Sequence, residues 1–380
     1  MKKNWQIKVF ILTVAVTLIA CQAVMGPVDD DITISGLPTR EAVVDGAEMP
    51  NTAPPSTEAG NAGESGNPTE SCFEGESYHP ESELCYRDDG SAEPLFLAMM
   101  AGVTDYSDED FADAEEVGEE ENLVKYTITG DEISAPEYED VSAELKPLQE
   151  DGETHERVWD FFSAIIPQER RDFVSDYLVF TDGKNGTLAA VEQTQADPYA
   201  WMVEIDPEDT TDMQDFTFTL IHEYGHLLTL NSEQVKVDET VFYNPEDDDA
   251  YFDAEDNCAT YFTGEGCANP SSYFYLFYDE FWADTYNEWL DIEMIEDDDA
   301  YYDALDEFWA GREDEFITEY AMTNPGEDIA ESWAVFVTHP KPTGNRIADE
   351  KVLFFYQFPE LVELRSEIIA RAYSRLIRVQ

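Results

Sequence analysis

Positively charged side chains are scarce in this sequence. Lysine and arginine together number 20 among 380 residues, against 86 aspartates and glutamates, and the formal net charge is −66. A chain of this sign repels phosphate backbones, so the composition excludes nucleic acid as a natural partner. The acids are spread along the chain instead of forming a tail, and only nine residues are lysine. This pattern is typical of a protein that works in salt, where screening shortens charge repulsion to roughly 8 Å or less.

Long apolar runs are also lacking. The uncharged run at residues 9–20 follows three lysines and ends at Cys21. It is too short for an ordinary membrane span, and a basic start before a short apolar run predicts a secretory signal over residues 1–20. Removing this signal takes away three lysines and no acid, so the net charge would fall from −66 to −69.

The residues "LIAC" at the end of this run resemble the lipobox of bacterial lipoproteins, in which the cysteine, here Cys21, is diacylated and becomes the new N-terminus. Two acyl chains are enough for stable membrane attachment. We therefore expect an exported protein, lipid-anchored in a bacterial cell envelope and facing a periplasm or a saline exterior. The alternative is a plain signal peptide with a coincidental cysteine.

Aromatic residues are absent from residues 22–71, which are rich in Pro, Gly, Ser, Thr, Asn and Glu. Such a segment cannot bury enough apolar surface to fold, so residues 21–71 are predicted to be a disordered tether. Residues 72–90 have the composition of a small disulfide-pinned hairpin. From residue 91 to residue 380 the composition is globular, which allows one large domain or two lobes.

Cysteine pairs with C-x-x-C spacing are absent, which disfavours a cysteine zinc site. Four cysteines remain when Cys21 is set aside, and an even number in an exported chain implies disulfides. Proximity in sequence favours the pairs Cys72–Cys85 and Cys258–Cys267. Each would close a short loop and contribute about 2–3 kcal/mol in the chain-entropy model.

The segment "FTLIHEYGHLLTL", residues 218–230, contains an HExxH motif and has the composition of a helix without proline. His222 and His226 are four residues apart, so a helix places both imidazoles on one face, where they can bind one ion. Glu223 can turn toward the same ion and polarise a bound water. A catalytic zinc ion requires a third protein ligand and an open position, and the motif alone does not supply that ligand.

Other segments indicate the fold class. Residues 176–180, 187–193 and 200–206 have strand composition, and the turn residues "TDGKNGT" predict a hairpin between the first two. Residues 158–166 and 359–379 have helical periodicity. We therefore expect an α+β fold with a small mixed sheet before the HExxH helix and a mainly helical C-terminal part.

A short acidic repeat occurs twice, as "EDDDAYFDA" at residues 246–254 and "EDDDAYYDA" at residues 296–304. Clustered carboxylates can hold Ca²⁺, but neither copy has the D-x-D-x-D-G spacing of a calcium loop. Acids are favoured at helix N-termini by the helix dipole. Each copy is therefore predicted to begin a solvated helix, with a calcium site as the weaker alternative.

The third metal ligand must be His, Asp or Glu. The metzincin spacing is absent, and His339, the only histidine after the motif, is predicted to lie in a loop. Residues 320–337 predict a second helix, because Asn324 is a good N-cap and a proline follows at the first helical position. Glu327 and Glu331 would share a face of this helix, but Glu327 also has the position of a capping-box glutamate. Spacing alone does not choose between them.

The residues Tyr320, Thr323, Asn324, Glu327 and Glu331, within "YAMTNPGEDIAE", together resemble the C-terminal signature of a peptidase family. This family is the anthrax lethal factor type of zincin metallopeptidases, which includes Pro-Pro endopeptidases and pairs HExxH with Y-x-x-T-N-x-x-E-[FD]-x-A-E on a later helix. The resemblance covers only these two segments. One hundred residues separate His226 from Glu327, more than expected of the family, and residues 228–319 are taken as an acidic insertion.

The resemblance implies a zincin-like fold for residues 91–380 and a role for each matched residue. It makes Glu327 the third zinc ligand beside the two histidines of the motif and Glu223 the general base. Tyr320 becomes the hydrogen-bond donor to the transition state, and Glu331 becomes a carboxylate supporting the ligands. The implied function is hydrolysis of a peptide or protein substrate, which could pair with the strand at residues 201–206. The alternative is a non-catalytic surface lipoprotein with a structural metal.

Overall fold

The computed structural model describes residues 77–79, 84–86, 90–103, 120–184, 186–295 and 297–379. The predicted secretory signal, tether, Cys21 lipid anchor and Cys72–Cys85 disulfide lie outside the described residues. Of the predicted hairpin at residues 72–90, two paired strands are described, β1 (Ser77–His79) and β2 (Leu84–Tyr86).

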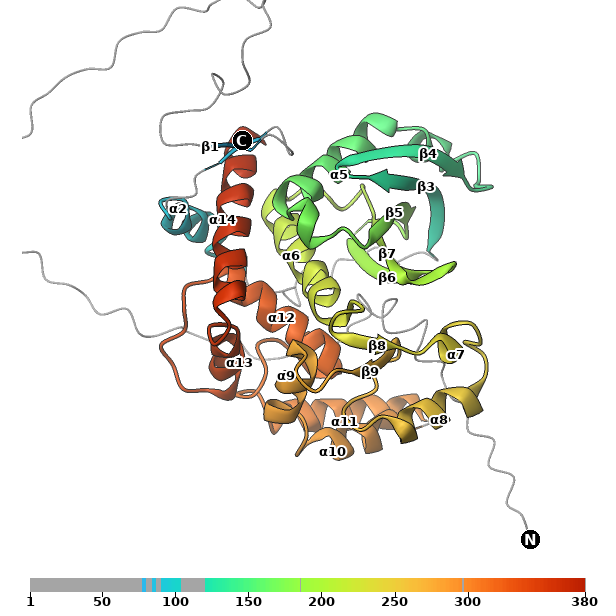
Figure 1. Ribbon diagram of the computed structural model, residues 1–380, viewed down its shortest axis with the longest axis vertical. Coiled ribbons are helices and arrows are strands. Elements are labelled where there is room, and N and C mark those ends of the chain that lie inside the picture. The colour runs from blue at the N-terminus through green and yellow to red at the C-terminus, as the bar shows by residue number, and fades with distance from the viewer. Residues whose placement is uncertain are drawn as a thin grey trace, which may run out of the picture.

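A five-stranded sheet forms the first half of the globular region (Figure 1). Its strands are β3 (Glu121–Thr129), β4 (Glu132–Tyr138), β5 (Val174–Thr181), β6 (Ala189–Thr194) and β7 (Asp197–Ile205), in the order β4-β3-β5-β7-β6. The pair β5–β7 is parallel and the other pairs are antiparallel, so the sheet is mixed. The predicted α+β class, with a mixed sheet before the HExxH helix, is confirmed.

The predicted hairpin between residues 176–180 and 187–193 is wrong. Strand β7 lies between β5 and β6, and β6 instead forms a hairpin with β7. The connection at residues 182–188 is longer than the two-residue turns that favour direct pairing, so it can carry the chain across the end of β7. Strand β7 is therefore an interior strand, and its side chains Val203 and Ile205 are fully buried.

Two helices, α5 (Gly152–Ile165) and α6 (Met213–Leu230), pack beside the sheet (Figure 1). The ring of Trp159 on α5 lies 5.5 Å from the ring of Tyr177 on β5, and Phe161 stacks on Phe216 of α6 at 5.4 Å. Asp212 is the N-cap of α6, and its carboxylate accepts hydrogen bonds from two backbone N–H groups of the first turn. The helix predicted at the HExxH motif is therefore present and rigidly packed.

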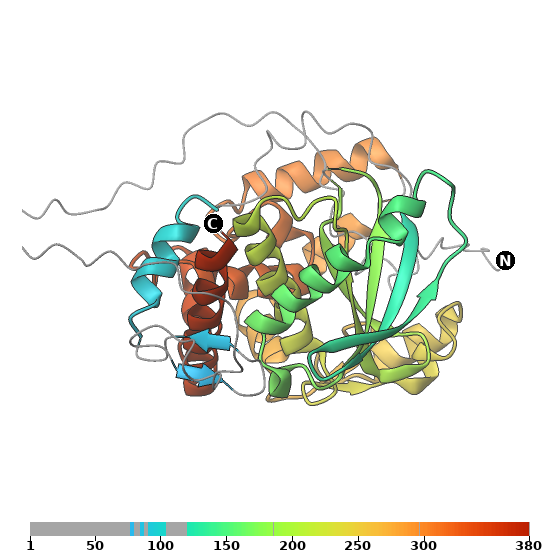
Figure 2. The same ribbon diagram turned by 90° about the horizontal axis from the view of Figure 1, so that it is seen from above.

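The rest of the chain is mainly helical, as predicted. Its helices are α7 (Glu239–Phe242), α8 (Asp248–Asn257), α9 (Tyr273–Phe281), α10 (Tyr286–Glu293), α11 (Asp298–Ala310), η3 (Tyr320–Thr323), α12 (Pro325–Thr338), α13 (Ile347–Phe355) and α14 (Pro359–Val379). Helix α14 has the predicted bounds and lies beside the β1–β2 pair and α2 (Glu93–Met100), as Figure 2 shows. The short helices α4 (Lys146–Gln149) and η2 (Gln168–Arg170) flank α5.

Both acidic repeats begin helices, as predicted. Asp247 accepts a hydrogen bond from the N–H of Ala250 at the start of α8, and Asp297 accepts one from Ala300 at the start of α11. These elements belong to the expected insertion at residues 228–319, although α6 itself continues to Leu230.

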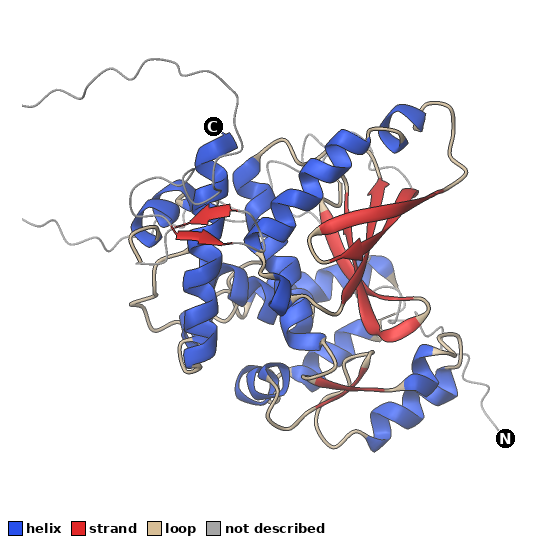
Figure 3. Cartoon of the chain, turned by 45° about the horizontal axis from the view of Figure 1, so that its top comes forward, coloured by secondary structure: helices blue, strands red, loops and turns tan. Residues whose placement is uncertain are grey.

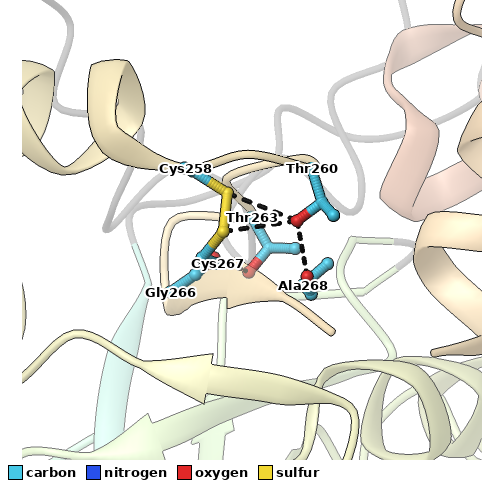
Figure 4. Close-up of a disulfide and its surroundings, with 6 residues drawn as sticks. All are labelled: Cys258, Thr260, Thr263, Gly266, Cys267 and Ala268. Atoms are coloured by element: carbon cyan, nitrogen blue, oxygen red, sulfur yellow. Dashed lines mark hydrogen bonds between the residues drawn. A yellow bond between two sulfur atoms is a disulfide. The ribbon is translucent and has the colours of Figure 1, made fainter. Parts of the chain in front are cut away.

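The insertion also contains a second small sheet, formed by β8 (Val235–Val237) and β9 (Gly266–Ala268) (Figure 3). The predicted disulfide Cys258–Cys267 is present and joins the end of α8 to β9. Beside it, the Thr260 hydroxyl donates to the carbonyl of Ala268 at 2.5 Å (Figure 4). Among the described residues, no helix has the length and apolar character needed to cross a membrane.

Candidate metal centre

Helices α6 and α12 cross at close range because small residues meet at the contact. A Cβ atom added to Gly225 would lie 3.0 Å from the Cα atom of Ala330 and 3.1 Å from Cδ1 of Trp333. Any larger residue at position 225 would push the helices apart. The glycine inside the HEYGH motif therefore lets the two motif segments, far apart in sequence, face each other.

The facing helices bring three ligand atoms together. The Nε2 atoms of His222 and His226 lie 3.2 Å apart, and Oε2 of Glu327 lies 3.2 Å from the first and 3.3 Å from the second. A tetrahedral ion with bonds of about 2.0–2.1 Å has ligand-to-ligand edges of about 3.3–3.4 Å. The three atoms thus form a nearly equilateral triangle of the size that one face of a zinc tetrahedron requires.

Glu331 lies behind this triangle. Its Oε1 atom lies 2.8 Å from Nδ1 of His222, and its Oε2 atom accepts a hydrogen bond from the hydroxyl of Thr318 at 3.3 Å. A carboxylate in this position favours the proton on Nδ1, which leaves the lone pair of Nε2 facing Glu327 and His226. The three atoms of the triangle, all buried, form a group that could hold a metal ion.

The pKa values of Glu327 and His222 depend on burial and on the partners of each side chain. Burial by itself raises the pKa of Glu327, but the charges and hydrogen bonds of His226 and His222 outweigh it and hold the pKa well below its usual range. Burial lowers the pKa of His222, and hydrogen bonds with Glu327 and Glu331 reverse this and raise it well above the usual value. The carboxylates of this group therefore favour positive charge beside them, and the imidazoles favour the negative charge of Glu327.

Glu223 is buried next to the ligands, with 3 % of its surface exposed. Burial raises the pKa of its carboxyl group to about 7, with the charges of Glu327 and Glu331 adding to the rise and those of His222 and His226 opposing it. A carboxyl group with this pKa exchanges protons near neutral pH, which is what a general base requires.

Tyr320 lies in the η3 turn that precedes α12, and its ring centroid is 5.9 Å from that of His222. Hydrogen bonds from both sides hold the turn: the hydroxyl of Thr318 accepts from the N–H of Ala321, and the Trp289 indole donates to the carbonyl of Thr323. The structure therefore places the ring of this tyrosine beside the ligand group.

Spacing alone did not choose between Glu327 and Glu331 as the third ligand, and the structure shows what each carboxylate contacts. Asn324 caps α12, and its side chain accepts hydrogen bonds from the N–H groups of Gly326 and Glu327, as predicted. The carboxylate of Glu327 contacts both histidines, whereas that of Glu331 contacts only the outer nitrogen of His222. His339 lies at the far end of α12, where its Nδ1 atom contacts the hydroxyl of Thr338, and it is not part of the ligand group.

A buried ion pair that the sequence did not reveal fixes α12 from the other side. The carboxylate of Asp328, next to Glu327, lies 2.6 Å from Nζ of Lys351 on α13 and accepts a hydrogen bond from the indole of Trp282 at 2.7 Å. All three side chains are almost fully buried. The only sequence signal was a lysine, rare in this chain, within the apolar helix "KVLFF". The ion pair ties α13 to the helix that carries Glu327, and the hydrogen bond from Trp282 ties the insertion to it.

Comparisons of this chain with protein-family models, with curated proteins and with solved structures find no match. The family resemblance therefore rests on the residues of α6 and of the η3–α12 segment. Since one fold can serve many functions, the function has to be argued from the chemistry of this site.

Proposed function

We propose that the protein is a zinc metallopeptidase of zincin-like fold, related to the anthrax lethal factor type. The observation that carries the proposal is the triangle of His222 Nε2, His226 Nε2 and Glu327 Oε2, with edges of 3.2–3.3 Å. Two imidazoles and one carboxylate suit zinc, whereas Ca²⁺ and Mg²⁺ prefer oxygen ligands alone. Three protein ligands leave a fourth position for water or substrate, which is the arrangement of catalytic zinc sites.

Bound by these ligands, zinc would supply Lewis acidity that lowers the pKa of water and polarises a peptide carbonyl. The chain's own residues then carry the protons. Glu223 accepts the proton of the attacking water and delivers it to the leaving amine. Tyr320 donates a hydrogen bond to the oxyanion that develops on the carbonyl oxygen. Glu331 holds His222 in the tautomer that keeps its Nε2 lone pair on the metal side.

The strand expected to receive a substrate needs correction. The strand at residues 201–206 corresponds to β7, whose backbone is already paired with β5 on one side and β6 on the other, so a third strand cannot add to it. Strand β6 is the edge strand on this side of the sheet, and it packs against α6. An extended peptide would therefore pair with β6 and run past the HExxH helix.

The competing proposal is a surface binding protein in which the metal is structural. A closed structural site has no use for a buried carboxylate such as Glu223 beside the ligands. The two proposals are separated by incubating the zinc-loaded protein with a mixed peptide library and analysing the products by mass spectrometry. Cleavage that a zinc chelator abolishes and added zinc restores supports the peptidase. One bound zinc ion per chain without cleavage of any peptide supports the structural role.

Replacing Tyr320 with phenylalanine tests the proposed oxyanion donor. If the hydroxyl acts mostly in the transition state, the variant loses roughly 10²-fold or more in kcat, with KM and zinc content nearly unchanged. If Tyr320 only packs against His222, the variant keeps a kcat within about threefold of wild type. Steady-state kinetics on any cleaved peptide, with zinc measured in the same samples, decide between the two results.

We also propose that Cys21 carries a lipid anchor. The variant Cys21→Ser cannot be diacylated, so it is expected to leave the membrane fraction of a bacterial host and to keep its zinc content and catalytic rate. Fractionation of cells followed by immunoblotting measures this. Tight membrane association of the variant would contradict the anchor.

A further inference from the structure

A second group of acidic side chains lies at another place on the sheet. Asp182 follows β5 and Asp206 follows β7. Because these two strands are parallel neighbours, both residues lie at the carboxyl ends of the strands, on the same side of the sheet. Asp209 lies in the connection that leads from β7 to α6. One carboxylate oxygen from each of the three residues lies within 4.8 Å of the other two.

The burial of this group is unusual for like charges. Asp206 is fully buried and Asp182 is 7 % exposed, and neither forms an ion pair with a lysine or arginine in the described part of the chain. The Oδ1 atom of Asp182 is buried and has no hydrogen-bond partner among the residues that the structure describes. A buried carboxylate oxygen without a partner is costly, and three adjacent carboxylates repel one another. A cation between them would remove both penalties.

Backbone groups orient the three carboxylates toward one another. Asp182 accepts a hydrogen bond from the N–H of Thr187 at 2.9 Å, Asp206 accepts one from Glu208 at 2.8 Å, and Asp209 accepts one from Gly186 at 3.2 Å. A Cβ atom at Gly186 would overlap the carboxylate of Asp182, so glycine is required where the chain passes over it. Burial, with the charges of Asp209 and Asp182, also raises the pKa of Asp206 to about 7, against the lowering effect of its hydrogen bonds.

We propose that Asp182, Asp206 and Asp209 bind a calcium ion. Oxygen ligands select hard cations, and three carboxylates favour Ca²⁺ over Mg²⁺, which is usually held by one or two carboxylates and several waters. Zinc is disfavoured because the group offers neither nitrogen nor sulfur. This site is separate from the acidic repeats at α8 and α11 and from the proposed zinc ligands.

Calcium at this position would fasten the start of the HExxH helix. The ion would join the carboxyl ends of β5 and β7 to Asp209, which lies three residues before Asp212, the N-cap of α6. The N–H of Asp182 already donates to the carboxylate of Asp206 at 3.3 Å, and the ion would extend this link between the strand ends to the segment that sets the position of α6. The expected result is a calcium-dependent gain in stability that does not require zinc.

The test uses thermal unfolding of the full chain after dialysis, with calcium chloride, magnesium chloride or neither. At calcium concentrations about 100-fold above the dissociation constant, the Tm of the wild type is expected to rise by roughly 5 °C or more, with a smaller rise in magnesium. Equilibrium dialysis with radioactive calcium should give one saturable site per chain. The dissociation constant is expected at about 10⁻⁴–10⁻³ M or below.

Matched variants locate the site. Asp182→Asn should abolish the calcium-dependent rise and, because one of three repelling charges is gone, should unfold at or above the wild-type Tm without calcium. The control Asp249→Asn removes an exposed acid at the start of α8 and should keep the full rise. If Asp182→Asn does not fold, Asp209→Asn, which is partly exposed, takes its place. The proposal is overturned if the wild type shows no calcium-dependent rise, or if Asp182→Asn or Asp209→Asn keeps it.

Discussion

Replacing Glu223 with glutamine is expected to lower peptide hydrolysis by about 10²–10⁴-fold, the typical contribution of a general base. Glutamine has the shape of glutamate but cannot accept a proton at the pH of the assay. Because Glu223 is not one of the three ligands, the variant should keep one zinc ion per chain. The measurement is kcat/KM on a peptide that the wild type cleaves, with zinc determined in the same samples.

The control for this variant is Glu233→Gln, the same chemical change on an exposed side chain just beyond α6. It should retain wild-type activity and zinc. An activity of Glu223→Gln within about tenfold of wild type would show that proton transfer takes another route. Loss of zinc together with activity would instead make Glu223 part of the metal site.

The second large effect is expected from Glu327→Gln, which should lose most of its zinc. A neutral amide is a poor zinc ligand, and Glu327 contacts both histidines of the triangle. Glu331→Gln changes a carboxylate that contacts only the outer nitrogen of His222, so zinc affinity should fall by only about 10–100-fold.

These two variants form a matched pair, since both glutamates are buried on α12 one turn apart. Zinc affinity is measured by competition with a chromophoric chelator, and circular dichroism confirms that both variants fold. The reverse order of effects, with Glu331→Gln losing zinc and Glu327→Gln retaining it, would show that Glu331 is the ligand.

The helices that build the site could be predicted because their signals are local. Asn324 and the proline after it mark the start of α12, and the four-residue spacing of His222 and His226 places both on one face of α6. The acidic repeats likewise mark the starts of α8 and α11. The disulfide Cys258–Cys267 was favoured by its short separation. In each case the deciding residues lie within a few positions of one another.

The features that the sequence did not reveal depend on contacts between distant residues. Strand composition identifies β5, β6 and β7, but nothing in it states that β7 separates the other two. The same is true of Lys351 with Asp328 and of Thr318 with Glu331, since the hydrogen-bonding capacity of each side chain can be satisfied in many ways. Asp182 and Asp206 become neighbours only because β5 and β7 pair in parallel.

The most direct test of the central proposal is a zinc titration of the dialysed protein with hydrolysis measured at each step. If His222, His226 and Glu327 hold one catalytic ion, the rate of peptide cleavage should rise in proportion to bound zinc and reach its maximum at one ion per chain. Glu223→Gln should bind the same single ion and stay inactive. Full hydrolysis without zinc, or one tightly bound ion per chain with no hydrolysis of any peptide, would contradict the proposal.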